Sequence, residues 1–79
     1  MNTQDVVETL IDVAQKAMPL LPFGPVGMIV ARAAVDAMQS ARETLALSEE
    51  QIVALDDERI ALERAVNERA KEVAAKLLG

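Results

Sequence analysis

Few side chains of this chain could do chemistry. Its 79 residues include no histidine and no cysteine, so an imidazole base, a thiol nucleophile and the soft metal ligands are missing. The two serines, Ser40 and Ser48, fit a helix surface and a helix cap. Gly24 and Gly27 lie in an apolar run that lacks the lysine of a phosphate-binding loop. We therefore expect a protein that is not an enzyme and that has no catalytic residue, cofactor or metal.

A row of carboxylates is the nearest approach to a metal site. Glu49, Asp56 and Glu63 recur every seven residues and would share one edge of a helix. Carboxylate oxygens could gather a hard cation there. The alternative, which we favour, is a solvated flank that pairs with arginines of a neighbouring helix.

Arg59 interrupts an otherwise apolar stripe in the C-terminal part of the chain. One interpretation is that its long side chain carries the charge out to solvent. The other is an ion pair at a helix interface, with Asp36 or Glu43 as the expected partner.

The charge balance argues against nucleic acid. The net charge is −5 and the isoelectric point is about 4.5, so phosphates would be repelled unless a basic patch existed. The basic residues of the C-terminal half scatter around the expected helix. The N-terminus is acidic and has no basic segment typical of a secretory signal. We expect a cytoplasmic protein.

Hydrophobic periodicity predicts an all-α fold in a single domain over residues 1–79, without strands. An amphipathic helix is expected over 3–18, an apolar corner rich in proline and glycine over 19–25, and an antiparallel helical hairpin formed by helices over 25–46 and 49–78. Ser48 and Gln51 have the spacing of a capping box, which predicts a sharp turn before the last helix.

The segment 17–31 reads AMPLLPFGPVGMIVA and contains no charge. It is shorter than the roughly 20 apolar residues that span a bilayer, and three prolines interrupt it. We expect a buried corner in which Phe23 fills the gap between two helix ends. Two other interpretations stay open, namely an exposed loop that touches a membrane or a partner, and a ligand of SH3 domains at Lys16–Pro22.

The apolar residues exceed what one small hairpin can cover. They make up 52% of the chain, yet a domain of this size buries only roughly 60% of its unfolded surface. We therefore predict a homo-oligomeric helical bundle. The predicted helix-packing or oligomer interface consists of Val30, Ala33, Ala34, Ala37, Ala41, Val53, Ile60, Ala74 and Leu78.

Together these patterns predict a non-enzymatic assembly module that binds copies of itself, or another protein, through helix faces. In composition the chain is similar to short helical proteins of bacteriophages and prophages, which implies a small accessory role. One alternative is a membrane-active protein that inserts helix 3–18 and segment 17–31. A second alternative is an oligomer that holds a small ligand between subunits.

Overall fold

The computed structural model describes residues 2–79 and is built from helices. Helix α1 spans Thr3–Ala17, the 3-10 helix η1 spans Met18–Phe23, α2 spans Pro25–Thr44 and α3 spans Glu49–Leu78. No strand occurs within residues 2–79. The expectation of an all-helical chain is confirmed, and the expected helix ends lie within two residues of the observed ones.

Side-chain caps begin two of the helices. The Asn2 side chain accepts a hydrogen bond from the Asp5 amide at 2.9 Å and starts α1. At the start of α3, Ser48 Oγ accepts from the Gln51 amide at 3.2 Å, and Gln51 Oε1 accepts from the Ser48 amide at 2.9 Å. This reciprocal pair is the predicted capping box.

The proline segment, expected as an apolar corner over 19–25, contains a short helix. Pro19 and Pro22 both lie in the 3-10 helix η1. Proline can adopt the backbone angles of such a helix although it donates no hydrogen bond, and the spacing of three residues equals one 3-10 turn. Gly24 then takes a φ of 110°, which favours glycine, and Pro25 opens α2.

Gly27 lets the first turn of α2 lie directly against η1. A Cβ atom at this position would overlap the backbone carbonyl of Leu20. Gly27 is buried, whereas its neighbour Val26 is 67% exposed. The absence of a side chain at Gly27 therefore sets the distance between the two helices.

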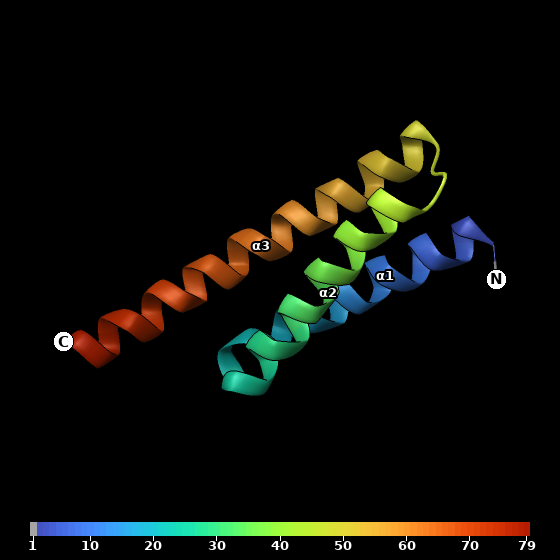
Figure 1. The fold of residues 1–79 in the computed structure, drawn as a ribbon. Helices are drawn as coiled ribbons and strands as arrows, with labels where there is room; N and C mark the ends of the chain where they lie inside the picture. Colours follow the sequence, from blue (N-terminus) through green and yellow to red (C-terminus); the bar gives the residue numbers. More distant parts are fainter. Residues whose placement is uncertain (1) are drawn as a thin grey trace.

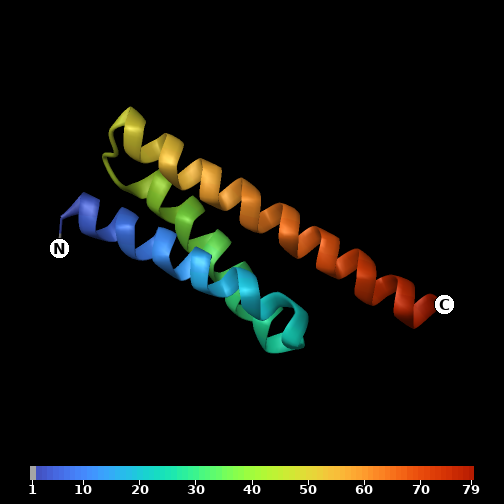
Figure 2. The ribbon, with the colours of Figure 1, turned by 180° about the vertical axis from the view of Figure 1, so that it is seen from behind.

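All three α-helices contact one another, and η1 contacts each of them. The views in Figures 1 and 2 show α1 and α2 side by side, with α3 beside both and projecting past them at its C-terminal end. The molecule is elongated, with principal extents of 47, 18 and 16 Å.

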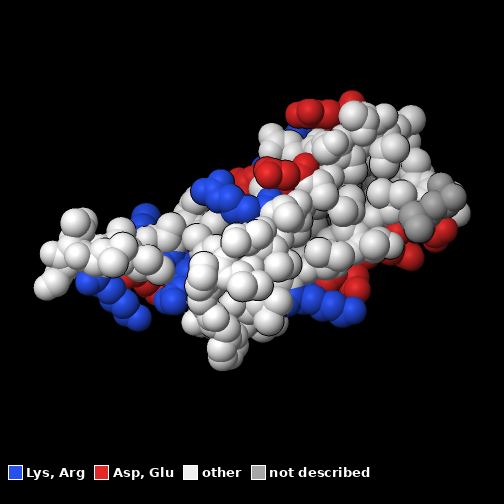
Figure 3. All heavy atoms as spheres, turned by 60° about the horizontal axis from the view of Figure 1, so that its bottom comes forward, with Lys and Arg blue, Asp and Glu red and all other residues white. Residues whose placement is uncertain are grey.

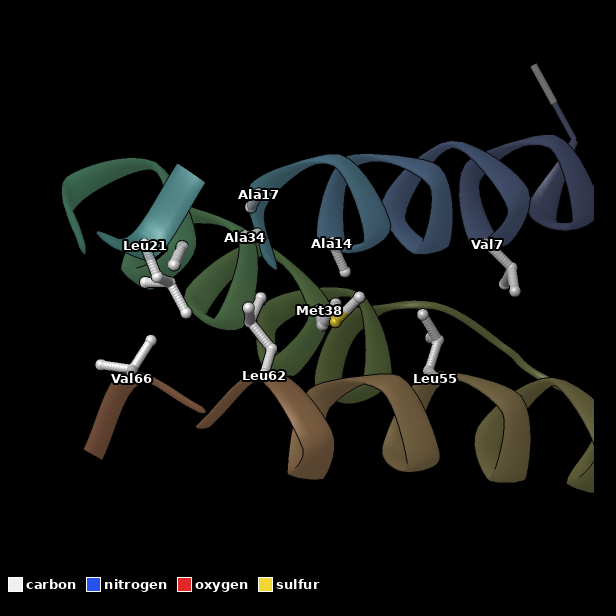
Figure 4. Packing of buried hydrophobic residues seen from close by; sticks show 10 residues of the cluster. Val7, Ala14, Ala17, Leu21, Ala34, Met38, Leu55, Leu62 and Val66 are labelled. Atoms are coloured by element: carbon white, nitrogen blue, oxygen red, sulfur yellow. The ribbon is translucent and has the colours of Figure 1, made fainter. Parts of the chain in front are cut away.

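The core consists of one apolar cluster drawn from every helix. Figure 4 shows Met38 of α2 between Ala14 of α1 and the leucines of α3. Met38, Leu55 and Leu62 are the largest side chains that are fully buried. Buried hydrophobic residues are Val7, Ala14, Ala17, Leu21, Ala31, Ala34, Met38, Ala41, Leu55, Leu62 and Val66.

The alanine sector of α2 is divided between the core and the surface. Ala34 and Ala41 are buried within the chain, at 3% and 7% exposure, whereas Ala33 and Ala37 are exposed. Of these four predicted interface positions, Ala34 and Ala41 therefore pack within the chain, whereas Ala33 and Ala37 are left uncovered by it. At 100° per residue, 34 and 41 lie within about 20° of each other, whereas 33 and 37 lie about 100° and 60° from Ala34.

Replacing Ser48 by alanine should lower the free energy of unfolding by about 1 kcal/mol, because the first amides of α3 lose their cap. Thermal or urea unfolding monitored by circular dichroism measures the change. Ser40→Ala on the exposed face of α2 is the matched control and should leave stability unchanged. Equal stability of the two variants would contradict a role for the cap.

Replacing Gly27 by alanine should destabilise the fold by about 1–3 kcal/mol, because the new methyl group has to displace the Leu20 carbonyl. Val26→Ala, one residue away and exposed, should change stability far less. If Gly27→Ala unfolds at the parental temperature, the close contact between η1 and α2 does not exist in solution.

Ala34→Glu should disrupt folding, since it inserts a long side chain and a charge into the core. Ala37→Glu, three residues along the same helix, should keep the parental helicity and melting temperature. Circular dichroism of both variants checks this difference. A reversed order of stability would mean that α2 packs through its other face.

Candidate functional site: an apolar groove

Helix α3 continues beyond the helices that cover it. Its 30 residues measure about 45 Å, against about 30 Å for the 20 residues of α2. Val66 is its last buried residue, and beyond Val66 only Arg69 is partly covered. The apolar stripe nevertheless continues through Ala70, Val73 and Leu77. The last three turns of α3 therefore present an apolar face that the rest of residues 2–79 leaves largely exposed to solvent.

This face and the start of α2 enclose a groove of about 570 Å³, which we name the terminal groove. Arg69 is the one charged residue among those that line it, and its Nη1 lies 3.1 Å from Glu72 Oε2. The other walls are apolar or backbone. The lining residues are Gly24, Pro25, Met28, Ile29, Arg69, Ala70, Val73, Ala74 and Leu77.

Large apolar side chains also stand exposed around the terminal groove. Phe23 is 81% exposed, Leu77 82% and Leu78 89%. In Figure 3, atoms that belong to neither acidic nor basic residues cover the lobe formed by η1 and the start of α2, and the tip of α3 at the left. Apolar surface gathered in this way is typical of a site that contacts a partner.

The expectation that Phe23 fills a buried corner is wrong. Leu21 takes that place, with 5% exposure. In a 3-10 helix, positions 21 and 23 point about 120° apart, so burying Leu21 turns Phe23 outward. The close approach at Gly27 also leaves no space for an aromatic ring between the two helices.

The residues predicted for an interface fall into three groups. Ala34 and Ala41 pack against other helices inside the chain, which agrees with the helix-packing part of the expectation. Val30 is half-buried and packs against the core. The remaining residues, which are exposed and stay candidates for an interface, are Ala33, Ala37, Val53, Ile60, Ala74 and Leu78.

Arg59 lies in a charge cluster that joins α3 to α2, but through partners other than those expected. Its Nη1 donates to Glu63 Oε1 at 2.9 Å, and its Nε lies 3.6 Å from Asp56 Oδ1. Asp56 Oδ2 in turn lies 3.6 Å from Nε of Arg42 on α2. The expected pairing with Asp36 or Glu43 is therefore wrong, because carboxylates one turn away on α3 itself are nearer.

Other candidates for chemistry find no support in the arrangement. Within residues 2–79, no group of three acidic side chains is placed to hold a metal ion. A polar hollow of about 220 Å³ between α2 and α3 is lined by Arg32, Asp36 and Glu63 and by no hydroxyl or thiol side chain. None of the described helices has the length and apolarity needed to cross a bilayer.

Of the residues that line the terminal groove, only Ala74 belongs to the predicted interface. The large apolar side chains of Met28, Ile29, Val73 and Leu77 do not. A usable signal was present in the sequence, since the helix expected over 49–78 is longer than the one over 25–46 and keeps its apolar spacing to the end. No comparable pattern in the sequence predicts how α2 and α3 cross, and this crossing opens the groove.

Comparison with protein-family models, curated proteins and solved structures gives no match to this chain. The similarity to phage and prophage proteins therefore rests on composition alone. The terminal groove and the charges around it are the features of the molecule that bear on its function.

Proposed function

We propose that this chain is a non-enzymatic assembly module. Its α2 and α3 form an antiparallel hairpin, and copies of the chain associate through exposed helix faces. The observation that carries the proposal is the terminal groove, where the apolar stripe of α3 continues for three turns without cover.

Several large apolar side chains are exposed to water. Ile29 is 67% exposed, Leu77 82% and Leu78 89%. Fully burying one side chain of this size stabilises a protein by about 1.5–3 kcal/mol. Several such side chains on one surface favour association strongly. The single chain has a small core, and a domain of this length is marginally stable alone.

Contact with a membrane surface is a second candidate. The exposed apolar side chains of Leu20, Phe23 and Val26 stand together near the turn between α1 and α2. Such a corner could dip into the boundary between lipid headgroups and acyl chains without spanning the bilayer. Unlike typical interfacial helices, the corner has only two flanking basic residues, Lys16 and Arg32. We therefore rank this candidate below self-association.

Light scattering at micromolar concentration should give a mass of a dimer or larger for the parent chain. Val73→Glu places a charge in the terminal groove and should shift the mass towards 8.5 kDa, the mass of one chain. Ala75→Glu, an exposed position of the same helix outside the groove, is the matched control and should keep the parental mass.

A parent chain that is monomeric and melts cooperatively would contradict self-association. Flotation with neutral lipid vesicles separates the two candidates. The assembly proposal expects the protein to stay unbound, whereas recovery of most of the protein with the vesicles would favour the membrane contact.

A further inference from the structure

We infer that the terminal groove receives the first half of α3 from a second copy of the chain, so that copies join head to tail. The inference rests on the self-association proposed above and specifies which surfaces meet. It is carried by two surfaces of the same molecule that are complementary in exposed apolar side chains and in charge.

The receiving surface is apolar, and because its one basic lining residue, Arg69, is paired with Glu72, the unpaired positive charge beside it comes from Arg32. No carboxylate lines the terminal groove. Arg32 adjoins it, since Arg32 shares a shallow hollow with Met28, Ile29 and, one turn further, Asp36. Within residues 2–79, Arg32 forms no ion pair, and the same holds for Lys76 in the last turn of α3. A helix that enters this groove is favoured if it brings carboxylates beside its apolar side chains.

The first half of α3 has that composition. Residues 49–63 contain six carboxylates and one arginine. Val53 and Ile60, seven residues apart and therefore on one face, are 58% and 45% exposed. The carboxylates of Glu49, Glu50 and Asp57 line a shallow hollow with Val53. None of these three carboxylates forms an ion pair with another described residue.

Other segments of a second copy fit the terminal groove less well. The last part of α3, residues 64–79, contains four basic and two acidic residues, so two such ends would bring like charges together. Helix α1 is acidic, but its most exposed large apolar side chain, Val13, is only 38% exposed. Its remaining apolar residues, such as Val7, serve the core of their own chain.

The two surfaces lie on different sides of α3. Positions 53 and 73 are 20 residues apart, which places their side chains about 200° apart around the helix axis. Two straight α3 helices lying side by side therefore cannot make both contacts with each other. Each contact joins two different surfaces, and repetition adds further copies into a ring or an open filament.

A mixing experiment tests this arrangement. Val53→Arg disables the acidic surface, and Val73→Glu disables the groove. Each variant alone should lose self-association by at least tenfold and approach 8.5 kDa in light scattering. A mixture in equal amounts retains one intact pair of surfaces, the groove of Val53→Arg and the acidic face of Val73→Glu. The mixture should therefore recover association and form at least a dimer of twice that mass.

Several outcomes would overturn the inference. If the parent chain is monomeric, both the inference and the proposed self-association fail. If the parent is oligomeric and the mixture stays monomeric, self-association stands and the head-to-tail contact is wrong. Parental mass in either single variant would exclude the corresponding surface. Ile60→Lys and Ile29→Glu provide second variants for the two surfaces, and circular dichroism verifies that every variant keeps the parental helicity.

Discussion

The apolar stripe of α3 has to be covered by two helices that are shorter than α3, and most features of this molecule depend on that mismatch. Leu55, Leu62 and Val66 are buried where α1 and α2 reach them. The same stripe continues to Leu77, where no part of residues 2–79 covers it. Hydrophobic burial thus stabilises the fold at one end and leaves an exposed apolar surface at the other.

Small side chains on α2 allow the neighbouring helices to approach it closely. Ala31, Ala34 and Ala41 place the backbone of α2 near its neighbours, and Met38 supplies the larger volume at the centre. Gly27, which has no side chain, likewise allows the backbone of α2 to lie close to η1. A core built from small residues packs tightly but buries little area for each residue, so the single chain gains only modest stability. Additional burial between copies would add to a fold of this kind.

Charge is distributed along α3 in a manner that suits assembly. The carboxylates concentrate in its first half and the basic residues in its second half. Part of this charge is neutralised within the chain, as in the cluster of Arg42, Asp56, Arg59 and Glu63. Exposed pairs of this type contribute little to stability. The carboxylates around Val53 form no ion pair within residues 2–79, and in the proposed head-to-tail contact they would favour one partner surface and orientation.

Local chemistry in the sequence determined where the helices begin and end. Ser48 and Gln51 set the start of α3, Pro25 opens α2 and Asn2 caps α1, because each of these groups acts on amides within a few residues. The apolar spacing also determined that three helices would form. These features could be predicted, since they require no knowledge of distant contacts.

Only the tertiary structure decided which faces those helices bury. The spacing of alanines on α2 allowed either Ala34 or Ala37 to face the core, and the crossing with its neighbours buried Ala34. The same crossing turned Leu21 inward and Phe23 outward, and it opened the terminal groove. Helical periodicity states which residues share a face, but the face that is covered depends on contacts between residues far apart in the chain.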